Sequence, residues 1–156
     1  MPFFDNYARS QKGAGNKTMV GEKTKQRKIL LVEDDDGIVR MLLLSLRSNG
    51  FETARAESGR EALKAMDEAN YDAVILDLCL PDGRGGDVLR RLQSTGHRTP
   101  WIVMSALDEE DAEERFGPLQ SPFLAKPFDL WDLIHLLDRL VGESPGGQAD
   151  VAKAAS

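Results

Sequence analysis

A run of apolar residues that ends in a single carboxylate constrains this chain most. Residues 73–76 read Ala-Val-Ile-Leu, Asp77 follows them directly, and Pro81 ends the segment soon after. A continuous apolar run without alternation is typical of a strand covered on both faces, as in a parallel sheet. Open parallel sheets bind ligands at the carboxyl ends of their strands, so we expect Asp77 at a binding edge. On this segment alone, a second interpretation stays open, in which Asp77 only caps the following turn.

Four other segments have strand character. Residues 29–32 and 101–104 are wholly apolar, and residues 123–125 form a shorter run. Residues 51–56 have the mixed character of an edge strand. Together with the Asp77 segment, the sequence predicts five strands.

Helical segments separate these strands. The first has four apolar residues at helical spacing: Ile38, Met41, Leu42 and Leu46. Ser58 and Glu61 form a capping box before the second, and the last covers about residues 129–141. Alternating strands and helices predict an α/β fold, a doubly wound five-stranded parallel sheet with helices on both faces. The flavodoxin-like strand order 2-1-3-4-5 is the expected one.

Composition divides the chain into three parts. We expect a flexible basic arm over residues 1–26, one folded domain over 27–142 and a disordered tail over 143–156. The first 28 residues carry a net charge of +5, whereas the whole chain carries −6. Met19 is an alternative start to Met1. An acidic body disfavours direct nucleic-acid binding.

Cysteine usage and hydropathy indicate the compartment. The chain has one cysteine, Cys79, which excludes an internal disulfide, and we expect it to be a small packed side chain. No apolar stretch approaches 18 residues, so we expect no membrane span and a cytoplasmic protein.

Polar residues end four of the five predicted strands: Glu33 and Asp34, Asp77, Ser105, and Lys126. Read singly, they could cap a helix, form a turn or lie on the surface, but together they would meet at one edge. Two carboxylates about 4 Å apart repel by about 4 kcal/mol at an effective dielectric of about 20. Mg²⁺ would remove this repulsion, since it prefers carboxylate oxygens. A carboxylate, a metal, an ammonium and a hydroxyl are together what phosphoryl transfer to an aspartate requires.

The sequence resembles a known family, the receiver domains of bacterial two-component response regulators, which include CheY-like stand-alone proteins. Four segments carry the resemblance: Ile29–Asp35, Val74–Pro81 with Asp82, Gly83 and Gly85 after it, Met104–Ala106, and Lys126–Phe128. It covers residues 28–141.

The resemblance implies a phosphoacceptor and a magnesium site. Asp77 would accept a phosphoryl group from a histidine kinase or phosphotransfer protein. Asp34 would bind Mg²⁺ directly and Glu33 mostly through water, with Asp77 and the backbone carbonyl of Cys79 as further ligands. Four consecutive acids leave a one-residue ambiguity, and we expect Glu33 and Asp34 to be the metal pair.

The resemblance also implies a switch. Ser105 and Lys126 would contact the phosphoryl oxygens. Ser105 would move inward on phosphorylation, and Phe123 would turn into the space that it leaves. This would repack the surface of the fourth helix, fifth strand and fifth helix for a protein target. The protein would not be a conventional enzyme, although it would assist its own phosphorylation and aspartyl-phosphate hydrolysis.

Some features depart from the family pattern. Ser105 stands for the commoner Thr, Phe123 lacks the hydroxyl of the usual Tyr, and residues 117–122 contain two prolines in place of Gly-Ala-Asp-Asp. The Lys126–Pro127 bond is expected to be cis. Since no output domain follows residue 141, we expect a stand-alone receiver or relay intermediate; its kinase, its target and whether it forms a homodimer stay open.

The same residues have three alternative interpretations. A haloacid-dehalogenase-like phosphohydrolase needs a second carboxylate two residues after its nucleophile, where this chain has Cys79. An FMN-binding protein needs a phosphate-cradling loop after the first strand, and the four acids there would repel phosphate. A degenerate receiver that serves only as a docking module remains the strongest alternative.

Overall fold

The computed structural model describes residues 26–94 and 98–142. The expected arm and tail therefore lie outside the described residues, apart from Gln26. Five strands lie in the described part of the chain: β1 (Lys28–Val32), β2 (Glu52–Ala56), β3 (Ala73–Asp77), β4 (Trp101–Ser105) and β5 (Phe123–Ala125). Helices alternate with them: α2 (Asp36–Ser48), α3 (Gly59–Glu68), α4 (Gly85–Gln93), α5 (Glu109–Phe116) and α6 (Leu130–Gly142).

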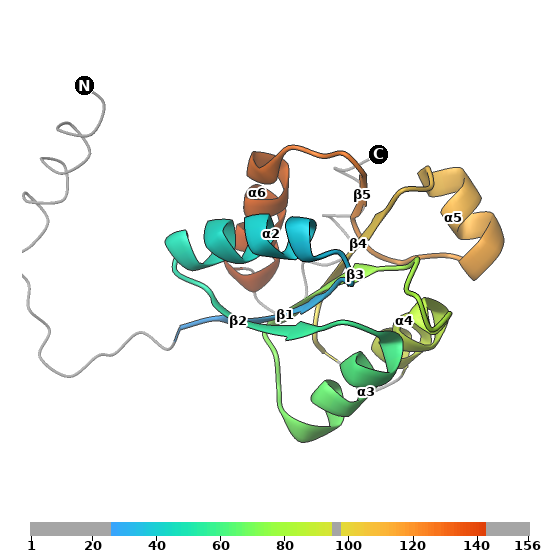
Figure 1. Cartoon of the computed structure of the whole chain (residues 1–156), viewed down its shortest axis with the longest axis horizontal. Helices are drawn as coiled ribbons and strands as arrows, with labels where there is room; N and C mark the ends of the chain where they lie inside the picture. The colour runs from blue at the N-terminus through green and yellow to red at the C-terminus, as the bar shows by residue number, and fades with distance from the viewer. Residues whose placement is uncertain (1–25, 95–97, 143–156) are drawn as a thin grey trace, which may run out of the picture.

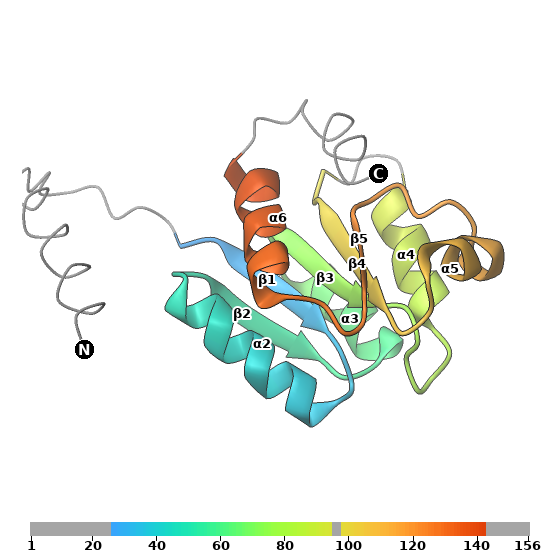
Figure 2. The same cartoon turned by 90° about the horizontal axis from the view of Figure 1, so that it is seen from above.

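The strands form one parallel sheet in the order β2-β1-β3-β4-β5, which confirms the predicted fold (Figure 2). β2 is an edge strand, as its mixed composition indicated. The chain reverses its winding direction between β1 and β3, which are neighbours in the sheet although β2 separates them in sequence. In doubly wound folds such a switch point opens a crevice at the carboxyl ends of the strands. The fold therefore places the ends of β1 and β3 at the expected binding edge.

Each side of the sheet has its own core, because successive strand residues point to opposite faces. Ile29 and Leu31 face α2 and α6, whereas Leu30 and Val32 face the core beneath α3 and α4. Figure 1 shows these two helix pairs on opposite sides of the sheet. Burial on both sides explains why β1, β3 and β4 are continuous apolar runs.

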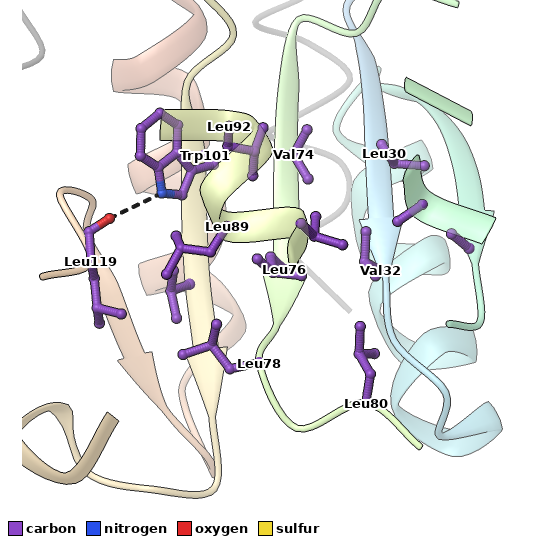
Figure 3. Close-up of a cluster of buried hydrophobic side chains, with 14 of the residues drawn as sticks. Leu30, Val32, Val74, Leu76, Leu78, Leu80, Leu89, Leu92, Trp101 and Leu119 are labelled. Carbon is purple, nitrogen blue, oxygen red and sulfur yellow. Dashed lines mark hydrogen bonds between the residues drawn. The ribbon is translucent and has the colours of Figure 1, made fainter. Parts of the chain in front are cut away.

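Trp101 anchors the second core to the connection between α5 and β5. Its indole Nε1–H donates to the carbonyl of Leu119 over 3.3 Å, and both residues are buried (Figure 3). The side-chain amide nitrogen of Gln93, Nε2, donates to the Pro118 and Leu119 carbonyls over 2.8 and 3.3 Å. The proline-containing segment 117–122 is thus fixed to α4 and β4 by its backbone carbonyls.

Two details of the helices differ from the sequence predictions. Met41 is 45% exposed, because α2 buries Val39, Leu42 and Leu46 and so presents a slightly rotated face to the sheet. Ser58 does cap α3 by accepting from the Glu61 amide over 3.1 Å. However, the Glu61 carboxylate accepts from the preceding amide, that of Glu57, over 2.8 Å. No helix among the described residues is both long and apolar enough to cross a membrane.

Candidate functional site

Three carboxylates meet where β1 and β3 end. Glu33 and Asp34 follow β1 directly, and Asp77 is the last residue of β3. Each of the three offers an oxygen, and these oxygens lie within 4.8 Å of one another. Glu33 and Asp77 are buried, with 1% and 3% of their surface exposed, whereas Asp34 is exposed. The pairing of two apolar strands side by side thus brings together acids that are more than forty positions apart in sequence.

Lys126 joins this cluster from the loop after β5. Its ammonium Nζ lies 2.6 Å from Glu33 Oε2 and 3.0 Å from Asp77 Oδ2. Its backbone amide donates to the Ser105 carbonyl over 2.8 Å, which holds the lysine against the end of β4. The Lys126–Pro127 bond is cis, as the resemblance implied. The ammonium therefore bridges the two buried carboxylates.

These contacts shift two pKa values. Burial raises the pKa of Glu33 above its ordinary value, and this outweighs the hydrogen bonds from Lys126 and from the Asp35 amide. Burial lowers the pKa of Lys126, but its hydrogen bonds to Glu33 and Asp77 outweigh that effect and raise the pKa overall. The lysine is thus held as a cation within the cluster.

Both oxygens of Asp77 have a donor. Oδ2 accepts from Lys126, and Oδ1 accepts from the backbone amide of Cys79 over 3.0 Å. Two donors on opposite oxygens fix the orientation of the carboxylate. A fixed carboxylate beside a fixed cation is a favourable arrangement for a nucleophile that attacks an anionic electrophile.

Ser105 is fully buried at the end of β4. Its Oγ accepts from the Leu107 amide over 3.1 Å and lies 3.7 Å from the Cys79 Sγ. The Cys79 side chain is exposed, so the expectation of a packed thiol is wrong. The cause is local: Leu78 and Leu80 on either side point into the core, which turns Cys79 outward.

Phe123 lies apart from the carboxylates, on β5. It is half-buried and packs against the second core, next to Val103 in the sheet register. The structure places it on the face of the sheet that α3 and α4 cover.

Two residues near the site were missed by the sequence reasoning. Asp82 accepts from the amides of Gly59, Arg60 and Arg84 over 3.0–3.2 Å. Burial raises the pKa of Asp82, but these hydrogen bonds together outweigh that effect and lower the pKa overall. It ties the loop after β3 to the first turn of α3. Arg55, the second, contacts the loop after β1. An Asp near a helix start and an Arg beside acids are common in sequences, so neither gave a distinctive signal.

The donor set fits Mg²⁺. Hard carboxylate oxygens are the protein ligands that this ion prefers, and two of the three belong to buried residues that need a cation nearby. The ammonium of Lys126 already meets part of that need. The backbone carbonyl of Cys79 lies two residues beyond Asp77 and is a further candidate ligand.

Comparison with known families identifies the family of this chain. The family model described as "Response regulator receiver domain" matches residues 29–138. The chain belongs to the receiver domain family of response regulators. Receiver domains of response regulators are signalling domains of two-component systems.

Relatives and solved structures extend the comparison. The chain is 32% identical over 127 residues to the cell cycle transcriptional regulator CtrA of Caulobacter vibrioides, covering 81% of this chain and 55% of CtrA. It is 37% identical over 122 residues to the transcriptional regulatory protein QseB of Escherichia coli O157:H7, covering 76% and 55%. The chain thus spans about half the length of these relatives.

A solved receiver domain has the same fold. This domain of the sensor histidine kinase PA1611 from Pseudomonas aeruginosa is 29% identical and has a TM-score of 0.68, covering 76% of this chain and 99% of that one. Its structure has a magnesium ion coordinated in the active-site cleft. The acidic cluster of the present receiver domain is consistent with Mg²⁺.

Proposed function

We propose that this receiver domain is phosphorylated on Asp77 by a histidine kinase or phosphotransfer protein and acts through protein contacts in the cytoplasm. One observation carries the proposal: Asp77 has a donor on each oxygen and forms a cluster with Glu33, Asp34 and Lys126 in which Asp77 and Glu33 are buried. A residue that only capped a turn would not need an ammonium beside it.

The residues of the site would have different roles in phosphoryl transfer. An Asp77 oxygen attacks the phosphorus of a phosphohistidine, the phosphorus–nitrogen bond breaks, and the imidazole leaves with that electron pair and takes up a proton. Lys126 and Ser105 then hold phosphoryl oxygens by charge and by a hydroxyl hydrogen bond. Glu33, Asp34, Asp77 and the Cys79 carbonyl would hold Mg²⁺, which supplies positive charge to the transferring group when bound.

Output would follow from a rearrangement of Ser105. In the present structure its Oγ accepts from the Leu107 amide, so turning toward a phosphoryl group would release this contact. Phe123 would then move into the space, changing the surface of α5, β5 and α6. The transcriptional relatives are consistent with a role in gene regulation, either through a partner protein or through further sequence.

Labelling by a small phosphodonor tests the assignment of Asp77. We expect Mg²⁺-dependent incorporation of phosphate into the wild type, loss of it in EDTA, and loss in Asp77→Asn. Asp138→Asn is the control, since it removes an exposed carboxylate on α6 without changing the site. Label that persists in Asp77→Asn would refute the assignment. Absence of label in every protein would favour the alternative of a docking module that works without phosphorylation.

A further inference from the structure

The side chain of Arg55 holds the loop that carries the metal-binding acids. Arg55 lies near the end of the edge strand β2, opposite Leu31 of β1, and its side chain is 23% exposed. Its Nη2 donates to the backbone carbonyl of Asp34 over 3.1 Å, and its Nε donates to that of Glu33 over 3.4 Å. One guanidinium thus contacts the backbone of both acids that follow β1.

Two further carboxylates fix the guanidinium itself. Nη2 also bonds Asp36 Oδ1 at 2.8 Å, and Nη1 lies 3.3 Å from Glu57 Oε1. Asp36 begins α2 and Glu57 follows β2, so Arg55 is held from both sides. The planar fork of arginine makes such a set of contacts possible, whereas an ammonium is a single point charge.

We propose that Arg55 is a positioning residue for the magnesium site: it fixes the backbone of Glu33 and Asp34 so that their carboxylates are in place before the ion arrives. The inference rests on the proposed function for the presence of Mg²⁺. Groups that orient the ligands of a metal change metal affinity by about 10- to 100-fold when they are removed. Arg55 contacts the backbone carbonyls of Glu33 and Asp34 and not their carboxylate oxygens, so an effect of about tenfold, at the low end of that range, is expected.

Electrostatics alone predicts the opposite sign. A positive charge next to a cation site opposes binding, so deleting it would tighten Mg²⁺ binding if Arg55 acted only through its charge. Positioning predicts weaker binding after the same deletion. The direction of the change therefore separates the two roles.

Calorimetric titration of the whole chain with MgCl₂ provides the test. We expect Arg55→Ala to weaken Mg²⁺ binding about tenfold. Arg55→Lys keeps the charge but not the fork, so its affinity should fall between those of the wild type and the alanine variant. Arg47→Ala is the matched control, because Arg47 is a cation that contacts the same strand, through Thr53, without touching the acidic loop. Its affinity should stay within about twofold of the wild type, since exposed side chains contribute little.

Amide hydrogen exchange in EDTA adds a readout that does not depend on the ion. Loss of Arg55 should speed exchange at residues 34–36 but leave the amides of β3 unchanged. Unchanged or tighter Mg²⁺ binding by Arg55→Ala would overturn the inference while leaving the proposed function intact. Failure of the wild type to bind Mg²⁺ would overturn the proposed function, and the inference with it.

Discussion

Replacing Lys126 by Met should destabilise the metal-free protein far more than the magnesium-loaded one. The ammonium lies 2.6 Å from Glu33 and 3.0 Å from Asp77, both of them buried. At an effective dielectric of about 20, each contact corresponds to a gross attraction of about 6 kcal/mol, and much of this is offset by desolvation of the charges. Removing one partner of a buried ion pair typically costs about 3–5 kcal/mol.

The lower end of that range applies here, because the Lys126 side chain is still 18% exposed. We expect Lys126→Met to lose about 3 kcal/mol of unfolding free energy in EDTA. Mg²⁺ at 100 times its dissociation constant for the variant should raise the unfolding free energy of the variant by about 2.7 kcal/mol. At the same Mg²⁺ concentration, the unfolding free energy of the wild type should rise less, since its ammonium competes with the ion for the same oxygens. Lys64→Met, which removes an exposed ammonium paired with Glu68, should cost under about 1 kcal/mol.

Urea unfolding monitored by far-ultraviolet circular dichroism measures these differences, with EDTA and MgCl₂ series run on all three proteins. The reasoning requires the gap between wild type and Lys126→Met to narrow when Mg²⁺ is present. A loss of equal size in both series would show that Lys126 stabilises the fold by packing and not by neutralising the acids. A loss below about 1 kcal/mol in EDTA would show that the buried pair contributes no more than an exposed one.

Two other predictions concern the protonation of Glu33 and the packing of Gly85. Because burial raises the pKa of Glu33, its stabilising contribution is complete below the ordinary value of 4.5 and is lost as the pH rises through the raised pKa. In EDTA, the unfolding free energy of the wild type relative to Glu33→Gln should therefore fall as the pH rises above 4.5, and a rise would contradict this. Gly85→Ala would place a Cβ 2.0 Å from the Leu78 carbonyl oxygen, so denaturant unfolding should reveal a loss of about 3 kcal/mol. Gly142→Ala, where the Cβ meets nothing within 4 Å, should stay within about 0.5 kcal/mol.

The fold could be predicted from the sequence because a strand that is buried on both faces is a continuous run of apolar residues. The segments at Ile29, Ala73 and Trp101 are apolar throughout, and each is a central strand with both faces covered. Which face of each helix is buried was harder to predict. In α2 the residues between Ile38 and Leu46 are mostly apolar, so spacing alone did not distinguish the buried face from a neighbouring one, and Met41 was misplaced.

The candidate site was predictable for a different reason. Parallel strands end at one edge, so a polar residue after each strand must lie near the others whatever the details of packing. Contacts that depend on side-chain geometry could not be found in this way. The guanidinium of Arg55 reaches across from the edge strand to Asp34, and Asp82 reaches α3, and no spacing rule in the sequence encodes either contact. The exposure of Cys79 has a different, local cause, since it lies between the core-facing side chains of Leu78 and Leu80.

The charges at the site explain why the ion and the lysine should both be needed. Three carboxylates and one ammonium leave a net charge of −2 in the cluster. An anionic phosphoryl group would be repelled by such a site, and two of the carboxylates are too deeply buried for water to screen them well. A divalent cation held by these carboxylates would bring the charge of the cluster to zero, and the Cys79 amide could still donate to Asp77. Under the proposed function, Lys126 would then turn from the acids to the incoming phosphoryl oxygens, and the ammonium that stabilises the metal-free protein would supply charge to the reaction.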